Sequence, residues 1–387
     1  MDGKDYNKLL EILIHGNIDF IAIAVSPWHA LGIDAFLYEL SDRLDRKIKG
    51  VIIIEQHSGN YTLNEGNFYS NSFADIEYFS NESQSNNELT LSIAFYKTIK
   101  IIRGLFNIIH EKKTKKNKTI YLVTPLWVNI SFIRYFCKKD ISNRYKPVFI
   151  LVDEGLGTYL SKKVWKLVDK KQNYSIIKTV KQDLLNKLSI DKRTTSLLRF
   201  LKCVELNERF LFKKSIPLKI NSNIAENYKK IINLQNDLRM ATNDSILIIT
   251  QPFSEKNMML QKDEMNIMKS LIDYLNELEY KVFLKPHPAE KINKYDNITC
   301  PNLIIIKDDL MAEKIIPNLN PNFVIGYTST VLINSSLLYG ITTISLVDML
   351  LNLSNNELLH VSSLEFKKLM GNSIYFVNCI DEIKKLI

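Results

Sequence analysis

Residues 148–155 have the sequence Val-Phe-Ile-Leu-Val-Asp-Glu-Gly, in which five apolar residues end at two carboxylates and a glycine. Residues 282–288 have the sequence Val-Phe-Leu-Lys-Pro-His-Pro, in which a shorter apolar run ends near a histidine between two prolines. Short apolar runs of this kind predict buried strands of a parallel sheet. In open α/β sheets, ligands bind at the carboxyl ends of the strands. The sequence therefore predicts an acidic group and an imidazole at two such strand ends.

Strand and helix patterns alternate along the chain, which favours α/β architecture with parallel sheets. In the first part we predict strands at residues 20–25, 51–54, 120–123 and 148–152, and helices at 30–44, 89–111 and 127–137. Residues 58–88 are polar and rich in Asn and Ser, which predicts long loops. The second alternation begins at residue 245, with strands predicted at 245–249, 281–284, 303–306, 323–326 and 342–347.

The length of 387 residues exceeds what one hydrophobic core usually serves, so we expect two domains. Residues 1–240 are predicted to form a Rossmann-like domain that ends in a basic helical connector, residues 156–240, without a buried strand. Residues 241–387 are predicted to form a second Rossmann-like domain, with the option that the final helix packs back on the first. Two such α/β domains facing a central cleft make up the GT-B fold, which is our prediction.

Composition excludes several classes of protein. No run of 18 or more apolar residues is present, so we expect no membrane-spanning helix. The polar segment Met1–Asp5 lacks the pattern of a signal peptide, and a cytoplasmic location is therefore expected. The four cysteines are scattered without a CxxC pair, which argues against a zinc site and a disulfide framework.

The net charge of +9 is unevenly distributed. Between Gly155 and Lys214 there are 15 Lys/Arg residues against 5 Asp/Glu residues. Such a density indicates a polyanionic partner or an anionic membrane surface, although a merely solvated face is an equal alternative. The lysines we single out for this role are Lys162, Lys163, Lys166 and Lys170. Nucleic acid is not expected, because the chain has neither zinc-finger spacing nor an aromatic RNA-binding pattern.

The acidic pair and the histidine are the candidate catalytic groups. Asp153 and Glu154 are adjacent on an extended segment, so their side chains point to opposite faces and only one can serve as a base. An acidic pair that merely starts a helix is the alternative. His287 has Lys285 and Pro288 beside it, which suits a group that meets a phosphate. An imidazolium there could neutralise or protonate a departing phosphate, and a simple turn histidine is the alternative.

A second group of residues suggests a nucleotide-binding site. Thr328, Ser329 and Thr330 lie between a predicted strand and a predicted helix, where free N–H groups and hydroxyls can bind phosphate. An ordinary helix cap is the alternative. Gln251 ends the first strand of the second domain and could form the wall of a nucleobase pocket. Glu313 could accept hydrogen bonds from a ribose. No pair of the DxD type stands out, so we expect neither a metal ion nor another cofactor.

Taken together, the motifs Asp153-Glu154-Gly155, His287-Pro288 and Ser329-Thr330 resemble those of the bacterial sialyltransferases, in the same order. The whole chain is similar to the capsular polysialyltransferases of glycosyltransferase family 38, and the segment Ala24–Gly32 adds to this impression.

The resemblance implies an inverting enzyme that uses CMP-sialic acid as its donor. Asp153 or Glu154 would deprotonate the acceptor hydroxyl, His287 would serve the phosphate leaving group, and Ser329 and Thr330 would hold the CMP phosphate. The second domain would bind the donor and the first the acceptor. That acceptor would be a sialylated or galactose-terminated glycan of a bacterial surface, in capsular polysialic acid or lipooligosaccharide. The basic residues would suit such a polyanion or the anionic inner face of the membrane.

Two other functions remain open at this point. A CDP-glycerol-dependent glycerophosphotransferase of the teichoic-acid type would use a similar His-Pro and Ser/Thr pair, with His29 as the candidate for its second histidine. A basic peripheral membrane protein of capsule export that kept the fold without the activity is the non-enzymatic alternative, against which the three intact motifs count.

Overall fold

The computed structural model describes most of the chain. Its described residues are 3–56, 63–82, 103–104, 106–107, 118–125, 136, 138–153, 155–161, 163–164, 167, 205–234, 244–307 and 310–387. The predicted helices at 89–111 and 127–137 lie largely outside these residues. Contacts divide the chain into two domains, which are described separately.

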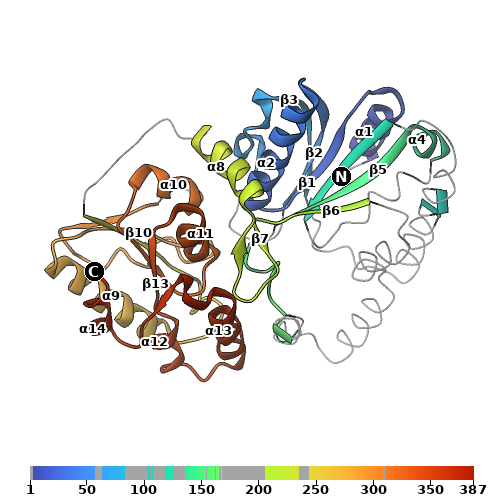
Figure 1. Ribbon diagram of the computed structural model, residues 1–387. Helices are drawn as coiled ribbons and strands as arrows, with labels where there is room; N and C mark the ends of the chain where they lie inside the picture. The colour runs from blue at the N-terminus through green and yellow to red at the C-terminus, as the bar shows by residue number, and fades with distance from the viewer. Residues whose placement is uncertain are drawn as a thin grey trace. The chain divides into compact units, whose positions relative to one another are not determined.

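The first domain contains a six-stranded parallel sheet with the order β3-β2-β1-β4-β5-β6 (Figure 1). Its strands are β1 (Phe20–Ala24), β2 (Ile48–Gln56), β3 (Ala74–Glu82), β4 (Lys118–Pro125), β5 (Tyr145–Val152) and β6 (Glu205–Arg209). Its helices are α1 (Gly3–His15), α2 (Pro27–Leu44) and α4 (Lys139–Arg144), with 3-10 turns η1 (Glu65–Asn67) and η2 (Ser70–Ser72). All five residues of β1 are buried, as expected for a central strand of a sheet covered on both faces.

The second domain contains a six-stranded parallel sheet with the equivalent order, β11-β10-β9-β12-β13-β14. Its strands are β9 (Ser245–Ile249), β10 (Lys281–Lys285), β11 (Leu303–Ile305), β12 (Phe323–Gly326), β13 (Thr342–Ser345) and β14 (Tyr375–Phe376). Its longer helices are α8 (Ser222–Leu234), α9 (Gln261–Glu277), α10 (Ala312–Leu319), α11 (Thr330–Tyr339) and α13 (Glu357–Met370). Shorter elements are β7 (Phe212–Lys213), β8 (Lys219–Ile220), α12 (Val347–Leu351), η4 (Gly371–Ser373) and α14 (Ile380–Ile383).

Each sheet has the doubly wound order of a Rossmann domain. Helix α9 packs against β10, and α11 packs against β12 and β13 (Figure 1). The hydrophobic core of the second domain joins these layers, with Ile248 of β9, Leu284 of β10 and Leu271 of α9 all fully buried. The prediction of two Rossmann-like α/β domains, the components of the GT-B fold, is confirmed.

Two strands of the first sheet were not predicted from the sequence, and neither were the two-residue strands β7, β8 and β14 of the second domain. β3 lies within the polar stretch for which we predicted loops, and β6 lies within the predicted helical connector. Both are edge strands of the first sheet, and edge strands carry polar residues because one side of them is open. The polar sequence of β6, Glu-Leu-Asn-Glu-Arg, therefore lacks the apolar run by which the central strands were found.

The division between the domains also differs from the predicted boundary at residue 240. The first domain consists of residues 1–154 and 173–210. The second domain consists of residues 155–172 and 211–387. The reason is that α8 buries an apolar face, including Ile231 and Ile232, in the second domain, where it contacts α10. The last helix of the chain, α14, contacts α9 and adds Ile383 to the core of the second domain.

In the part of the chain that the structure describes, no helix has both the length and the apolar character needed to cross a membrane.

Asp19, which immediately precedes β1, ties three strands of the first domain together. Its carboxylate accepts two hydrogen bonds from the guanidinium of Arg46, at 2.9 and 2.8 Å, and one from the backbone N–H of Lys49 at 3.0 Å. The ammonium of Lys118 lies 3.0 Å away. Burial opposes ionisation of this carboxyl, but the bonds from Arg46, Lys49 and Lys118 outweigh burial and lower the pKa of Asp19.

We expect Asp19→Asn to lower the free energy of unfolding by about 1–3 kcal/mol at pH 7, because Arg46, Lys49 and Lys118 lose a buried, charged acceptor. Because the pKa of Asp19 is lowered by folding, its carboxylate contributes fully to stability at pH values above 3.8, the ordinary pKa of aspartate. This contribution is lost as the pH falls through the lower pKa of the folded protein. Chemical denaturation of both proteins at pH 7 and pH 3 measures the difference, which should shrink at pH 3.

Asp75→Asn is the matched control, since Asp75 pairs with Lys47 while its side chain is 48% exposed. Exposed ion pairs contribute less than about 1 kcal/mol. Equal losses for the two variants at pH 7 would contradict the role given to Asp19.

Candidate functional site

Two predicted donor-binding segments meet at the carboxyl edge of the second sheet. Gln251 follows β9 and Thr328 follows β12, and these two strands are neighbours at the point where the strand order reverses. The backbone N–H and the hydroxyl of Thr328 both donate to Oε1 of Gln251, at 2.8 and 2.9 Å. Ligands of doubly wound domains bind at this switch point. The topology thus puts Gln251 and Thr328 where a nucleotide would bind.

The N-terminus of α11 lies in the same segment. Ser329 is its N-cap, with an extended backbone, and its hydroxyl accepts from the N–H of Val331 at 3.2 Å. Thr330 is the first residue of the helix. A helix start carries unpaired N–H groups and the positive end of the helix dipole, both of which favour an anion. Ser329 is therefore an ordinary cap in its local geometry, at a position suited to phosphate.

The glycine of the acidic motif contacts the Ser/Thr motif. The N–H of Leu156 donates to the hydroxyl of Thr330 at 2.8 Å. Gly155 has a φ of +81°, and a Cβ added to it would lie 3.0 Å from Oγ1 of Thr330. A side chain at this position would thus be strained in the backbone and crowded against Thr330. Leu156, which follows the glycine of the acidic motif, and Thr330 are 174 residues apart in sequence and meet within the second domain.

Asp153 belongs to the first domain, where it follows β5 and is fully buried. Glu154, Lys162, Lys166 and Lys170 lie outside the described residues. Lys163 is described and is exposed. The structure therefore places Asp153 at a strand end, as predicted, and leaves the choice between the two carboxylates open.

His287 is held by its backbone and by its ring. Its N–H donates to Oε2 of Glu290 at 2.7 Å and approaches Oγ1 of Thr250 at 3.1 Å. Its Nδ1 accepts from the N–H of Ala289 at 3.0 Å. A neutral imidazole that accepts at Nδ1 carries its proton on Nε2. The loop thus selects the tautomer in which Nε2 is a hydrogen-bond donor.

The ring is neutral at physiological pH. Burial lowers the pKa of His287 to about 4, helped by the positive charges of Lys256 and Lys285 and opposed by the carboxylates of Glu290 and Glu255. The sequence analysis allowed for an imidazolium at this position. The physical reason for the difference is that burial disfavours the charged ring and its neighbours include two lysines.

The other predicted donor-binding residues lie in the same domain. Lys285 ends β10 and is 6% exposed, and Pro288 follows His287 in the loop. Glu313 is buried in the first turn of α10, where it accepts from Nδ2 of Asn334 of α11 at 2.9 Å. Burial raises the pKa of Glu313. Its bond to Asn334 fixes the direction of the carboxyl, and no contact here tests the predicted ribose role.

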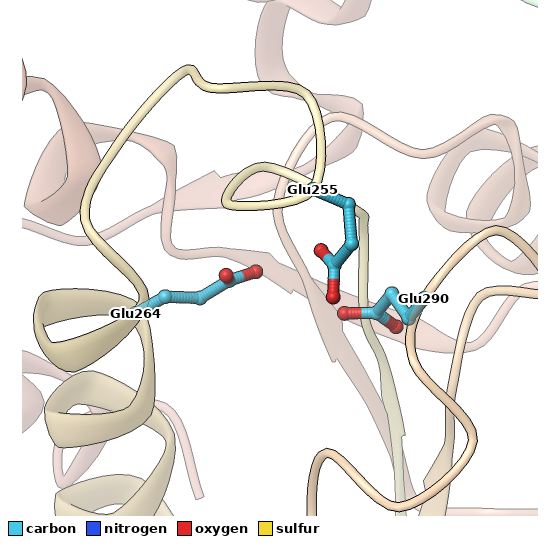
Figure 2. A group of neighbouring side chains, drawn as sticks. All are labelled: Glu255, Glu264 and Glu290. Atoms are coloured by element: carbon cyan, nitrogen blue, oxygen red, sulfur yellow. The ribbon is translucent and has the colours of Figure 1, made fainter.

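Three carboxylates converge beside the histidine loop, as Figure 2 shows for Glu255, Glu264 and Glu290. Among the described residues, they form the one group whose oxygens lie close enough, within 4.8 Å, to hold a metal ion. The ammonium of Lys294 lies 2.8 Å from Glu264, 2.8 Å from Glu290 and 3.1 Å from Glu255. These bonds outweigh burial and raise the pKa of Lys294. An ammonium thus takes the place that a metal ion would need.

Sequence analysis missed Glu290 and Lys294 as parts of this site. Their signal was weak, because Glu290 is three residues after His287 and Lys294 is four residues after Glu290, in a loop without helical or strand periodicity. Only the folded loop brings the carboxylate of Glu290 to the backbone of His287 and the ammonium of Lys294 to that carboxylate.

Comparisons with known proteins complete the description. The family model for Alpha-2,8-polysialyltransferase (POLYST) matches residues 20–348. Comparison with curated protein sequences finds no significant match. Among solved structures, the chain is similar to a 2,6-sialyltransferase of a Photobacterium species in complex with CMP and lactose, with 15% identity and a TM-score of 0.46 over 92% of this chain and 78% of that one.

Two further solved structures have comparable similarity. An alpha/beta-galactoside alpha-2,3-sialyltransferase of Photobacterium phosphoreum shows 12% identity and a TM-score of 0.46, over 95% of this chain and 100% of that one. The wall teichoic acid polymerase TagF shows 12% identity and a TM-score of 0.44, over 97% of this chain and 80% of that one. These likenesses do not separate one activity from another.

The family model does separate them, because its match spans most of the chain and includes all three motifs described above. The chain therefore belongs to the alpha-2,8-polysialyltransferase family and is a sialyltransferase, a class of glycosyltransferase.

Proposed function

We propose that this sialyltransferase transfers sialic acid from CMP-sialic acid to a sugar hydroxyl of a bacterial surface glycan, with inversion and without a metal ion. The observation that carries the proposal is the bond from Leu156 to Thr330, which sets the glycine of the acidic motif against the Ser/Thr motif. Asp153 and Glu154 directly precede this glycine in the sequence.

In the proposed reaction, Asp153 or Glu154 accepts the proton of the acceptor hydroxyl. The acceptor oxygen forms a bond to the anomeric carbon of sialic acid as the bond from that carbon to the phosphate oxygen breaks. The electron pair of the broken bond goes to the phosphate of CMP, where negative charge accumulates. A single displacement of this kind inverts the configuration and needs one base and one group that stabilises the leaving phosphate.

The leaving phosphate is the proposed partner of α11 and His287. The N-terminus of α11, with Thr328 and Ser329, would bind the phosphate through N–H groups and hydroxyls. His287 would donate a hydrogen bond from Nε2, which the loop tautomer supports. A donor aimed at developing charge typically contributes a factor of about 10²–10³ to the rate. Lys285 and Glu313 are proposed to contact the rest of the donor.

The absence of a metal requirement is supported by the carboxylate cluster. Glu255, Glu264 and Glu290 surround the ammonium of Lys294, and metal binding would have to displace it. We propose that the phosphate charge is met by hydrogen-bond donors of the protein.

The acceptor is proposed to be a sialylated or galactose-terminated glycan, either a growing capsular polysialic acid or a lipooligosaccharide. Lys163 is exposed at the start of the basic segment, which suits an anionic sugar chain or an anionic inner-membrane surface.

To test the function, the purified protein is incubated with CMP-sialic acid and labelled lactosides and oligosialosides, with product length resolved. We expect CMP release that depends on the acceptor, a product of inverted configuration, and unchanged rates after EDTA treatment. CDP-glycerol is the control donor. Transfer from CDP-glycerol without transfer from CMP-sialic acid would overturn the proposal, and loss of activity with EDTA that Mg²⁺ restores would overturn metal independence.

The tautomer and charge of His287 lead to a second prediction. His287→Gln keeps an N–H donor near the position of Nε2, whereas the shorter side chain in His287→Asn reaches only the position of Nδ1. We therefore expect kcat of the Gln variant to exceed that of the Asn variant about tenfold. Because the pKa of His287 is about 4, kcat/KM of the wild type should show no histidine inflection near pH 6.5. Steady-state kinetics between pH 5 and 8 measure both effects.

The His287→Gln variant is also the control for the pH profile. An inflection between pH 6 and 7 that is present in the wild type and absent from this variant would show that His287 titrates there, against the neutral-donor role.

The contact between Gly155 and Thr330 leads to a third prediction. Gly155→Ala should lower kcat/KM for CMP-sialic acid at least tenfold, because its Cβ would crowd Oγ1 of Thr330. Gly340→Ala is the matched control, since Gly340 also has a positive φ, +71°, and an added Cβ meets nothing within 4 Å. Both variants should lose about 1 kcal/mol or more of stability from the left-handed backbone. Equal kinetics for the two variants would contradict a role for this contact in the site.

A further inference from the structure

Glu290 has a buried carboxylate whose two oxygens each accept two hydrogen bonds. Oε2 accepts from the backbone N–H of His287 at 2.7 Å and from the hydroxyl of Thr250. Oε1 accepts from the ammonium of Lys294 at 2.8 Å and from the hydroxyl of Tyr295 at 2.7 Å. The side chain of Glu290 is fully buried. One carboxylate therefore joins the end of β9 to both ends of the loop that carries His287.

The two oxygens face different parts of the structure. Oε2 faces the start of the histidine loop, and Oε1 faces Lys294 and Tyr295 at its far end. Lys294 in turn pairs with Glu255, from the loop after β9, and with Glu264 of α9. Glu290 is thus the one member of the three-carboxylate group in Figure 2 that has a hydrogen bond to the backbone of His287 among the described contacts.

The ring of His287 depends on the same loop. Its Nδ1 accepts from the N–H of Ala289, two residues along, so the tautomer is fixed by the backbone between His287 and Glu290. Without the carboxylate of Glu290, the N–H of His287 would keep only the longer contact to Oγ1 of Thr250, 3.1 Å, and the loop would lose its shorter anchor at this residue. The ring would then no longer be held in one orientation with Nε2 as the donor.

We propose that Glu290 is a positioning residue for sialyl transfer, which anchors the loop of His287 so that its imidazole presents Nε2–H to the leaving phosphate. This inference rests on the proposed function of His287. Glu290 itself touches neither the donor nor the acceptor in this scheme.

The charged groups that face the ring are Lys256 and Lys285, which favour its neutral form, and Glu290 and Glu255, which favour its charged form. Removing the charge of Glu290 therefore lowers the tendency of His287 to protonate. A change in its tautomer after substitution of Glu290 is consequently a sign of lost anchoring and not of protonation.

The test uses two near-isosteric variants that differ in their ability to accept hydrogen bonds. Glu290→Gln keeps an acceptor for the N–H of His287, and Glu290→Met keeps the volume without an acceptor. We expect kcat to fall about 100-fold in the Met variant and less than about tenfold in the Gln variant. The KM for CMP-sialic acid should stay within about threefold in both, because the residues proposed to bind the nucleotide are unchanged.

A second readout needs no catalysis. Nitrogen-15 NMR of labelled histidine, without donor, reports the tautomer of His287, whose signals are assigned by their loss in His287→Gln. The wild type and Glu290→Gln should show the Nε2–H tautomer, and Glu290→Met a mixture of both. This measurement is independent of turnover. If the protein is inactive with CMP-sialic acid, the proposed function is overturned, but the spectra still show whether Glu290 anchors the loop of His287.

Asp34 supplies the matched control. It is fully buried in the first domain and, like Glu290, accepts from a backbone N–H and a hydroxyl, both of Ser70. Asp34→Asn should cost stability and leave the tautomer of His287 unchanged. A wild-type tautomer and kcat in Glu290→Met, or the same loss of kcat in Asp34→Asn, would overturn the proposal.

If Glu290→Met does not fold, Thr250→Val tests the same junction. It removes the hydroxyl that contacts both His287 and Glu290 while keeping the side-chain volume. We expect a fall in kcat of about tenfold with partial loss of the single tautomer. A wild-type spectrum and rate in this variant would likewise overturn the proposal.

Discussion

The ammonium of Lys294 is buried among three carboxylates, and the second domain depends on this arrangement at its functional edge. Buried charges are tolerated only when they are paired and hydrogen-bonded, so the group has one well-satisfied geometry. That geometry fixes the loop after β9 through Glu255, helix α9 through Glu264, and the histidine loop through Glu290. The parallel sheet of the second domain provides the carboxyl edge at which the loops begin. Lys294 and its three carboxylates then determine how these loops are arranged.

Much of this organisation could be predicted from the sequence, for identifiable reasons. Central strands such as β1 and β9 are continuous apolar runs, and the motifs that follow β5, β10 and β12 stand where such runs end. The edge strands β3 and β6 escaped prediction because their sequences are polar. The domain boundary escaped it because the amphipathic pattern of α8 shows that one face is buried and does not show which domain covers that face.

The sequence predicted which residues belong to the candidate site, but it did not predict the hydrogen bonds between them. Asp153, His287 and Thr330 were all singled out, yet neither the bond from Leu156 to Thr330 nor the one from His287 to Glu290 can be recognised from the spacing of residues in the sequence. The first joins segments 174 residues apart, and the second depends on a loop without periodicity. The charge of His287 was missed for a related reason, since burial in the folded state sets it and a sequence does not reveal burial in a loop.

The neutral ring of His287 also affects how CMP would dissociate after the proposed transfer. The phosphodiester of CMP-sialic acid carries about one negative charge, whereas the phosphomonoester of free CMP carries nearly two at neutral pH. A permanent cation at His287 would hold the more highly charged product more firmly than the incoming substrate, and turnover would be limited by product inhibition. An uncharged hydrogen-bond donor discriminates far less between the two, so in the proposed reaction His287 would assist cleavage of the bond to phosphate and still allow CMP to dissociate.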